Sequence, residues 1–239
     1  MIPDTSRTVI EQLLKQRDYI DLVIPRGGEG LIRYVTENSQ IPVIQHFKGV
    51  CHLFIDKFAD QDKAINILVN GKTQKPSACN ALETLLVHRE IAEQILPKVA
   101  GALADYQVKI HACPDSLAYF EQAEPASEDD YHAEYLTQEI AVKVVDSFDS
   151  AIGHINEFSS DHTEVIVSQD TSRTQRFVRA INSSVVMVNA SSRFSDGGQL
   201  GLGSEIGIST SKLHAYGPMG LESLTTEKFV VIGDGQVRA

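Results

Sequence analysis

The chain has 239 residues, of which 42% are hydrophobic and 7% aromatic, so it is long enough for one large or two modest hydrophobic cores. Its formal net charge is -11 at pH 7 and no basic stripe is present, which argues against nucleic acid and anionic lipid as partners. No apolar run approaches the roughly 20 residues that cross a bilayer, and the first residues do not resemble a secretion signal. We therefore expect a cytoplasmic protein that binds small molecules or other proteins.

The cysteines and histidines do not suggest a metal site. Cys51, Cys79 and Cys113 are widely separated, which fits neither a disulfide framework nor a thiolate zinc site. Eight histidines are scattered along the chain, without the spacing that metal-binding motifs require. We expect no metal, and one of the cysteines is available as a reactive thiol.

Helices and continuous apolar strands alternate in the first part of the chain. Apolar residues at helical spacing mark the helices, and short runs such as CHLFID mark buried strands. In chain order, we predict a helix at residues 6–17 behind a Thr5/Ser6 cap, a strand at 20–24, a turn at 25–28 followed by a short helix, strands at 41–45 and 51–56, and a helix at 60–70. This alternation predicts parallel βαβ units.

The same alternation continues as far as residue 190. In chain order, the pattern predicts a strand at 83–88, an amphipathic helix at 89–106, strands at 106–113 and 141–147, a helix at 148–157, a strand at 164–168, a helix at 173–182 and a strand at 185–190. The acidic stretch at residues 120–135 is predicted to be a solvated loop. The glycine- and serine-rich stretch at 191–220 has no sustained period, and long irregular stretches of this kind are usually functional or disordered.

Cys79 is the best candidate nucleophile on local sequence. It lies in TQKPSACNA, a loop of proline and small residues between a predicted helix and a predicted strand. A thiol there can be partly exposed and can meet backbone N–H groups that lower its pKa and later hold an oxyanion. The alternative is a buried structural cysteine, which describes Cys51 and Cys113 better.

Two glycine-rich segments and one arginine are weaker candidates. PRGGEGL joins a strand to a helix and could hold phosphate through backbone N–H groups, or it could simply be a turn. GLGSEIG lacks the strand–turn–helix context of a nucleotide fingerprint, so we reject it. Arg193 could pair with a substrate carboxylate or phosphate, or it could be a solvated loop arginine.

Several long motifs carry a family resemblance over essentially the whole chain. They are IPRGGEGLIRYV, NGKTQKPSACNALETLLVH, VNASSRFSDGGQLGLGSEIGISTSKLHAYGPMGLESLTT and IGDGQVRA. Together they resemble the γ-glutamyl phosphate reductases (glutamate-5-semialdehyde dehydrogenases), a branch of the aldehyde dehydrogenase superfamily. The resemblance implies NADPH-dependent reduction of L-glutamyl 5-phosphate to L-glutamate 5-semialdehyde and phosphate, the second step of L-proline biosynthesis from glutamate. It also implies a homo-oligomer and functional coupling to glutamate 5-kinase.

By position, the resemblance assigns roles to individual residues. Cys79 matches the family's nucleophile, which displaces phosphate to give a thioester. Glu134 lies where the superfamily has a glutamate that bonds the ribose on the nicotinamide side of the cofactor. Gly27 and Gly28 fall at a glycine-containing turn near the cofactor.

The loop from Arg193 through Phe194 to Gly198 matches the segment that faces the substrate, so the resemblance favours an anion contact there. One departure concerns His46, which stands where hydrolytic aldehyde dehydrogenases carry a glutamate that activates water on the thioester. An enzyme that reduces its thioester would lose product to that water, so the missing glutamate fits the reductase branch.

The resemblance also implies that the family's chain begins well before Met1. We therefore expect an aldehyde dehydrogenase-like α/β fold in three parts: the trailing part of a Rossmann-like NADP-binding domain at residues 1–62, a catalytic α/β domain at 63–222 and an oligomerisation strand at 223–239. Sheet edges left uncovered would make this chain alone prone to instability or aggregation. Two other hypotheses stay open: a catalytically incompetent fragment that acts at most as an assembly partner, and a different acyl phosphate or aldehyde as substrate.

Overall fold

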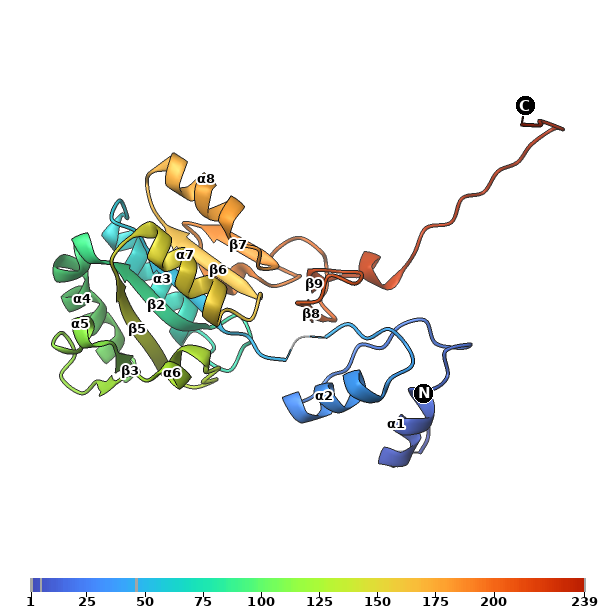
Figure 1. The fold of residues 1–239 in the computed structure, drawn as a ribbon, viewed down its shortest axis with the longest axis horizontal. Coiled ribbons are helices and arrows are strands. Elements are labelled where there is room, and N and C mark those ends of the chain that lie inside the picture. The colour runs from blue at the N-terminus through green and yellow to red at the C-terminus, as the bar shows by residue number, and fades with distance from the viewer. Residues whose placement is uncertain (1, 5, 46, 239) are drawn as a thin grey trace.

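The computed structural model describes residues 2–4, 6–45 and 47–238 of the chain. These residues form a central sheet of seven parallel strands, in the order β4-β3-β5-β2-β1-β6-β7 (Figure 1). The strands are β1 (Cys51–Ile55), β2 (Leu82–His88), β3 (Lys109–Ala112), β4 (Glu124–Pro125), β5 (Glu139–Val145), β6 (Thr163–Val167) and β7 (Val185–Val188). The predicted parallel α/β fold is confirmed.

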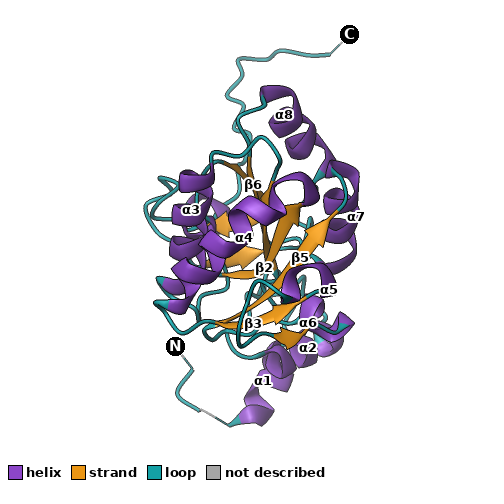
Figure 2. Cartoon of the chain, turned by 90° about the vertical axis from the view of Figure 1, so that its left-hand side faces the viewer, coloured by secondary structure: helices purple, strands orange, loops and turns teal. Residues whose placement is uncertain are grey.

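Helices cover both faces of this sheet (Figure 2). One face packs against α3 (Gln61–Thr73) and α4 (Arg89–Ala104), and the other packs against α7 (Phe148–Phe158) and α8 (Thr171–Ala180). The strands β1, β2 and β6 are buried at every residue, which is why they read as continuous apolar runs. Each fully buried Leu, Ile or Phe in these layers contributes about 1.5–3 kcal/mol.

Side-chain caps fix where the layered helices begin. The carboxylate of Asp60 accepts a hydrogen bond from the backbone N–H of Lys63 at the start of α3, and Asp170 does the same for Arg173 at the start of α8. Such caps stabilise a helix by about 1 kcal/mol each. The shorter helices are α1 (Arg7–Leu13), α2 (Glu29–Asn38), α5 (Pro114–Leu117) and α6 (Glu128–His132).

The described residues that precede Cys51 lie outside the seven-stranded sheet (Figure 1). The strands expected at residues 20–24 and 41–45 are reduced to one parallel bridge, between Val23 and Val43. The strand expected at 51–56 is β1, and it pairs with β2 on one side and β6 on the other, so it belongs to the larger unit. The division into domains remains a proposal, and these pairings move its first boundary from residue 62 to before Cys51.

Two further segments differ from expectation. The acidic stretch at 120–135 contains β4 and α6, because Ser127 and Asp130 form a capping box that starts a helix. The C-terminal stretch holds two short 3₁₀ helices (Ser192–Phe194 and Glu222–Leu224) and an antiparallel pair, β8 (Gly207–Ser209) with β9 (Gly217–Met219). From there the chain runs away from the body, and Phe229 is 99% exposed (Figure 1).

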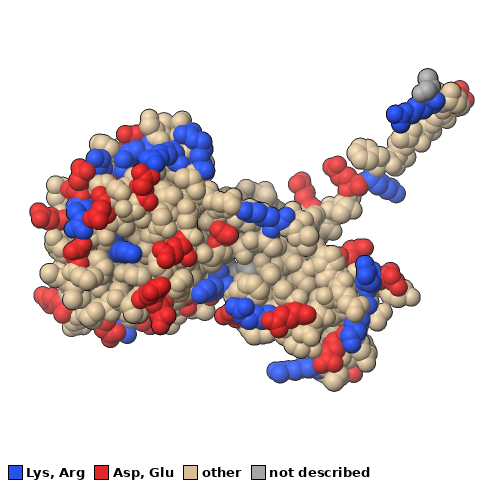
Figure 3. Space-filling model, in the orientation of Figure 1, with Lys and Arg blue, Asp and Glu red and all other residues tan. Residues whose placement is uncertain are grey.

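Acidic and basic side chains are interspersed on the face drawn in Figure 3. A small group of basic residues lies on α8, where Arg173 pairs with Asp56 and Arg176 with Asp149. None of the helices in the described part of the chain is long and apolar enough to cross a bilayer.

Candidate active site

Cys79 lies at the end of the sheet that is formed by the N-terminal ends of the parallel strands. It belongs to the loop between α3 and β2, and the segments that precede β1 and β6 reach the same end because the strands are parallel. The Cys51 Sγ donates to the Cys79 carbonyl oxygen over 3.4 Å, and a side chain on Gly49 would meet that same oxygen. The Asn80 side chain donates to the Ser195 carbonyl over 2.8 Å. The Cys79 loop is thus held between the start of β1 and the glycine-rich segment.

The thiol of Cys79 is half-buried, and its surroundings favour the protonated form. Burial, together with the negative charges of nearby Glu205 and Glu134, raises its pKa to about 11, and the positive charge of Arg193 opposes this shift. The thiolate is the nucleophilic form, so the fixed charges around Cys79 decide how much of it exists near neutral pH. Cys51 is deeply buried, and burial raises the pKa of its thiol well above the usual value.

Two charge-removing substitutions are expected to shift the pKa of Cys79 in opposite directions. Glu205→Gln removes a negative charge that disfavours the thiolate, so alkylation of Cys79 by iodoacetamide will rise at a lower pH than in the unmodified chain. Arg193→Gln removes the positive charge, so the rise will move to higher pH. The pH profile of the alkylation rate, read by peptide mass spectrometry at Cys79, measures both. Shifts in the same direction in both variants would refute this electrostatic account.

Glu134 is tied to the start of β1 rather than standing free. Its Oε1 accepts a hydrogen bond from the Gly49 N–H over 2.8 Å, and burial raises the pKa of its carboxyl group. The neighbouring Lys48 Nζ donates to the His132 carbonyl over 2.7 Å. These bonds place Glu134 close enough to influence the Cys79 thiol.

His46, at which the missing glutamate was noted, lies outside the described residues.

The turn at Gly27 and Gly28 opens α2. Gly28 is the N-cap in an extended conformation, and nothing lies within 4 Å of where its Cβ would be, whereas a Cβ on Gly27 would meet a methyl group of Leu31 at 2.7 Å. Arg26 Nη1 donates to the Ile206 carbonyl over 2.9 Å. Since Ile206 follows Glu205, one segment links this turn to the surroundings of Cys79.

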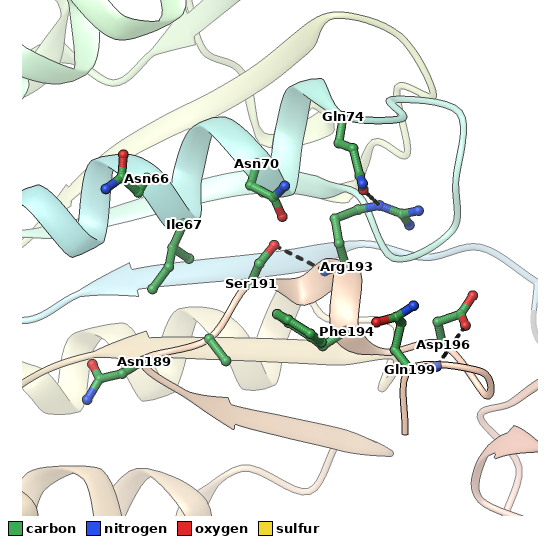
Figure 4. Close-up of a pocket in the computed structure, with 11 residues that line it drawn as sticks. Asn66, Ile67, Asn70, Gln74, Asn189, Ser191, Arg193, Phe194, Asp196 and Gln199 are labelled. Atoms are coloured by element: carbon green, nitrogen blue, oxygen red, sulfur yellow. Dashed lines mark hydrogen bonds between the residues drawn. The ribbon is translucent and has the colours of Figure 1, made fainter. Parts of the chain in front are cut away.

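Arg193 and Phe194 line a cavity of about 540 Å³ between α3 and the segment after β7 (Figure 4). Arg193 Nε donates to Gln74 Oε1 over 2.8 Å, and Phe194 is 51% exposed. Gly198 does not line the cavity, but its N–H donates to Asp196, which does. Cys79 is also outside the lining.

Sequence reasoning missed five polar residues of this region. Gln74, Asp196 and Glu205 are recognised only through contacts with distant segments, so no local signal marks them. Asn66 and Asn70 do carry a signal, because their spacing of four places them on one face of a helix. No cluster of three or more possible metal ligands occurs within residues 2–4, 6–45 and 47–238.

Comparisons with known proteins agree with this fold. No protein-family model matches the chain. It is 78% identical over 239 residues to the γ-glutamyl phosphate reductase of Colwellia psychrerythraea, covering 100% of this chain and 57% of that protein. The crystal structure of γ-glutamyl phosphate reductase from Thermotoga maritima superposes with a TM-score of 0.96 at 46% identity, covering 100% of this chain and 57% of that one.

A more distant structure supports the fold class alone. The acetylating aldehyde dehydrogenase from Geobacillus thermoglucosidasius has a TM-score of 0.74 at 17% identity, over 98% of this chain and 61% of that one. The aldehyde dehydrogenase-like fold is thereby confirmed. From end to end, the chain matches the γ-glutamyl phosphate reductases, as its motifs indicate, and it spans 57% of the length of the curated relatives.

Proposed function

We propose that this chain is the nucleophile-bearing part of a γ-glutamyl phosphate reductase, which uses NADPH to convert L-glutamyl 5-phosphate to L-glutamate 5-semialdehyde and phosphate in L-proline biosynthesis. The position of Cys79 carries the proposal. Its loop is held on both sides, its thiol is half-buried, and Arg193 is near enough to favour the thiolate. A cytoplasmic location and functional coupling to glutamate 5-kinase belong to the same proposal.

The residues around Cys79 support an acyl-transfer step. The thiolate attacks the acyl carbon, a C–S bond forms, the bond from that carbon to the phosphate oxygen breaks, and phosphate leaves with the electron pair. The proton of the thiol must leave first, and the positive charge of Arg193 favours its loss. The product of this step is a thioester on Cys79.

The residues around the turn at Gly27 and Gly28 fit a cofactor. The space around Gly28 is open, and the N-terminus of the ten-residue helix α2 starts there with its unpaired N–H groups and positive dipole end. Glu134, on the segment that anchors Gly49, is proposed to bond the cofactor ribose, and Gly27 and Gly28 to border the cofactor. When bound, NADPH supplies the hydride that reduces an acyl group to an aldehyde.

Cys79→Ala is expected to abolish both turnover and acylation. Turnover is measured as phosphate-dependent NADP reduction by glutamate semialdehyde, and acylation as the mass added to Cys79 by acetyl phosphate, a simple acyl phosphate. The matched control is Cys113→Ser, in which a hydroxyl replaces a buried sulfur that accepts from the Val144 N–H over 3.3 Å. We expect this control to retain activity. Substantial turnover by the Cys79→Ala variant would sink the assignment.

A second candidate function is favoured by the C-terminal tail. Residues 226–238 are all exposed, and Phe229, Val231 and Ile232 are each more than 90% exposed. An extended apolar segment of this kind suits pairing with the sheet edge of another subunit, so we propose the tail as an oligomerisation strand. A catalytically incompetent fragment would still assemble in this way. Sedimentation of the chain with and without residues 226–239 checks it: equal masses would contradict the proposal.

A further inference from the structure

The cavity beside Arg193 is a lined groove with distinct walls (Figure 4). One wall is the face of α3 that carries Asn66, Asn70 and, at its C-terminal end, Gln74. These three carboxamides are spaced four residues apart, so they span about 12 Å along the helix. The opposite wall is the segment from Asn189 to Gln199 that follows β7.

Apolar and polar groups alternate around this cavity. Ile67, which is 9% exposed, and the ring of Phe194 supply apolar surface between the carboxamides of α3 and the charged groups of the opposite wall. Such a mixture suits a short carbon chain that ends in polar groups. It does not suit a purely apolar ligand, because the exposed carboxamides of Asn66, Asn70 and Gln74 would lose hydrogen bonds to water beneath such a ligand.

Two opposite charges line the cavity without neutralising each other. The bond from Nε to Gln74 holds the guanidinium of Arg193 in place, and its two Nη nitrogens have no recorded protein partner among the described residues. Asp196 Oδ1 accepts from the N–H groups of Gly198 and Gln199 over 2.9 and 3.2 Å, which orients the carboxylate, and Oδ2 has no partner recorded in the described part of the chain. A cation and an anion are thus both positioned and available for a ligand.

Cys79 does not line the cavity, but two residues that do line it, Gln74 and Arg193, connect it to Cys79. Gln74 precedes Cys79 by five residues at the end of α3, and Arg193 acts on the Cys79 thiol. A substrate whose acyl carbon meets Cys79 therefore leaves its far end for the cavity. The phosphate of an acyl phosphate is bonded to the acyl carbon itself, so it departs at Cys79 and not along α3.

We propose that this cavity binds the α-amino-acid end of the acyl substrate, with the Nη groups of Arg193 on the α-carboxylate and Asp196 Oδ2 on the α-ammonium. A planar guanidinium matches a carboxylate through two parallel hydrogen bonds. The methylene groups between the two ends of the substrate pack against Phe194 and Ile67. This inference rests on the proposed function and adds to it the residues that select an amino-acid acyl group over a plain one.

Titration calorimetry with four probes tests the assignment. The probes are L-glutamate, glutarate (which lacks the ammonium), 4-aminobutanoate (which lacks the α-carboxylate) and inorganic phosphate. Arg193→Gln is expected to weaken L-glutamate and glutarate about 10- to 100-fold and to leave 4-aminobutanoate unchanged. Asp196→Asn keeps the acceptor for Gly198 and Gln199 and is expected to weaken L-glutamate and 4-aminobutanoate but not glutarate. Arg179→Gln, which changes an exposed residue of α8, is the matched control and should change none of them.

Several results would overturn the inference. These are an absence of L-glutamate binding to the unmodified chain, an equal loss for all probes, or an effect of Arg193→Gln on phosphate but not on glutarate. Calorimetry on the Cys79→Ala chain separates this inference from the proposed function. Selective binding by the Cys79→Ala chain, with no acylation of Cys79 in the unmodified chain, would refute the proposed function alone. Acylation of the unmodified chain by acetyl phosphate, without selective binding, would refute the cavity assignment alone.

Discussion

Replacing Gly49 by alanine is expected to destabilise the chain by about 3 kcal/mol or more and to displace Cys79. A Cβ at residue 49 would lie 2.0 Å from the Cys79 carbonyl oxygen and 2.9 Å from its carbonyl carbon. Both atoms are backbone, so the clash is relieved only by moving the Cys79 loop or the start of β1. Such a move also strains the bond from the Gly49 N–H to Glu134. Urea unfolding and the rate of Cys79 alkylation measure the two effects.

Gly101→Ala is the matched control for this substitution. Gly101 lies in α4, is exposed, and has nothing within 4 Å of the place of its Cβ. Alanine is a better helix former than glycine by about 1 kcal/mol, so this variant is expected to be slightly more stable than the unmodified chain. An unfolding midpoint of Gly49→Ala equal to that of the unmodified chain would show that the two segments are not packed as described.

The close approach of Gly49 to Cys79 also shows where sequence reasoning ends. The helices at 89–106 and 148–157 and the strands at 83–88 and 164–168 were predicted, because a helical stripe and a doubly covered strand leave patterns within one segment. The place of β1 in the sheet was not, because an apolar run reads the same whichever strands flank it. Strand pairing depends on two segments, whereas a hydrophobic pattern is read within one segment.

The candidate site divides in the same way. Cys79 and Arg193 were singled out because a thiol among small residues and an arginine in a glycine-rich loop stand out locally. Glu205 was not, because its influence on the Cys79 thiol depends on a contact across more than a hundred residues. Asp196 was missed because its carboxylate accepts hydrogen bonds only from its own loop. Its candidate role in binding follows from its lining the same cavity as Arg193.

Breaking the ion pair between Lys72 and Glu83 is expected to cost about 3–5 kcal/mol. Lys72 Nζ lies 2.6 Å from Glu83 Oε2, and the two side chains are 0% and 1% exposed. Burial raises the pKa of Glu83 to about 7 and lowers that of Lys72, while the attraction between them opposes both shifts. Lys72→Met or Glu83→Gln removes the attraction and leaves the burial, so the remaining partner is driven toward its neutral form.

The two single variants are therefore expected to respond to pH in opposite directions. In Lys72→Met, Glu83 keeps its proton in the folded state above the pKa of about 4.5 at which the unfolded chain loses it, so stability falls as pH rises. In Glu83→Gln, Lys72 is neutral in the folded state at pH values where the unfolded chain still binds a proton, so stability rises with pH. Urea unfolding midpoints at several pH values between about 5 and 9 measure both slopes.

The double variant Lys72→Met/Glu83→Leu decides between an ion pair that stabilises and one that merely avoids an unpaired charge. Replacing a whole buried pair by apolar side chains is often neutral or favourable, because neither charge has to leave water. The double variant is therefore expected to unfold close to the midpoint of the unmodified chain and to lose the pH slopes of both single variants. A double variant as unstable as either single variant would mean that the pair itself stabilises the fold. In that case the start of β2, just beyond Cys79, would depend on this pair for its position.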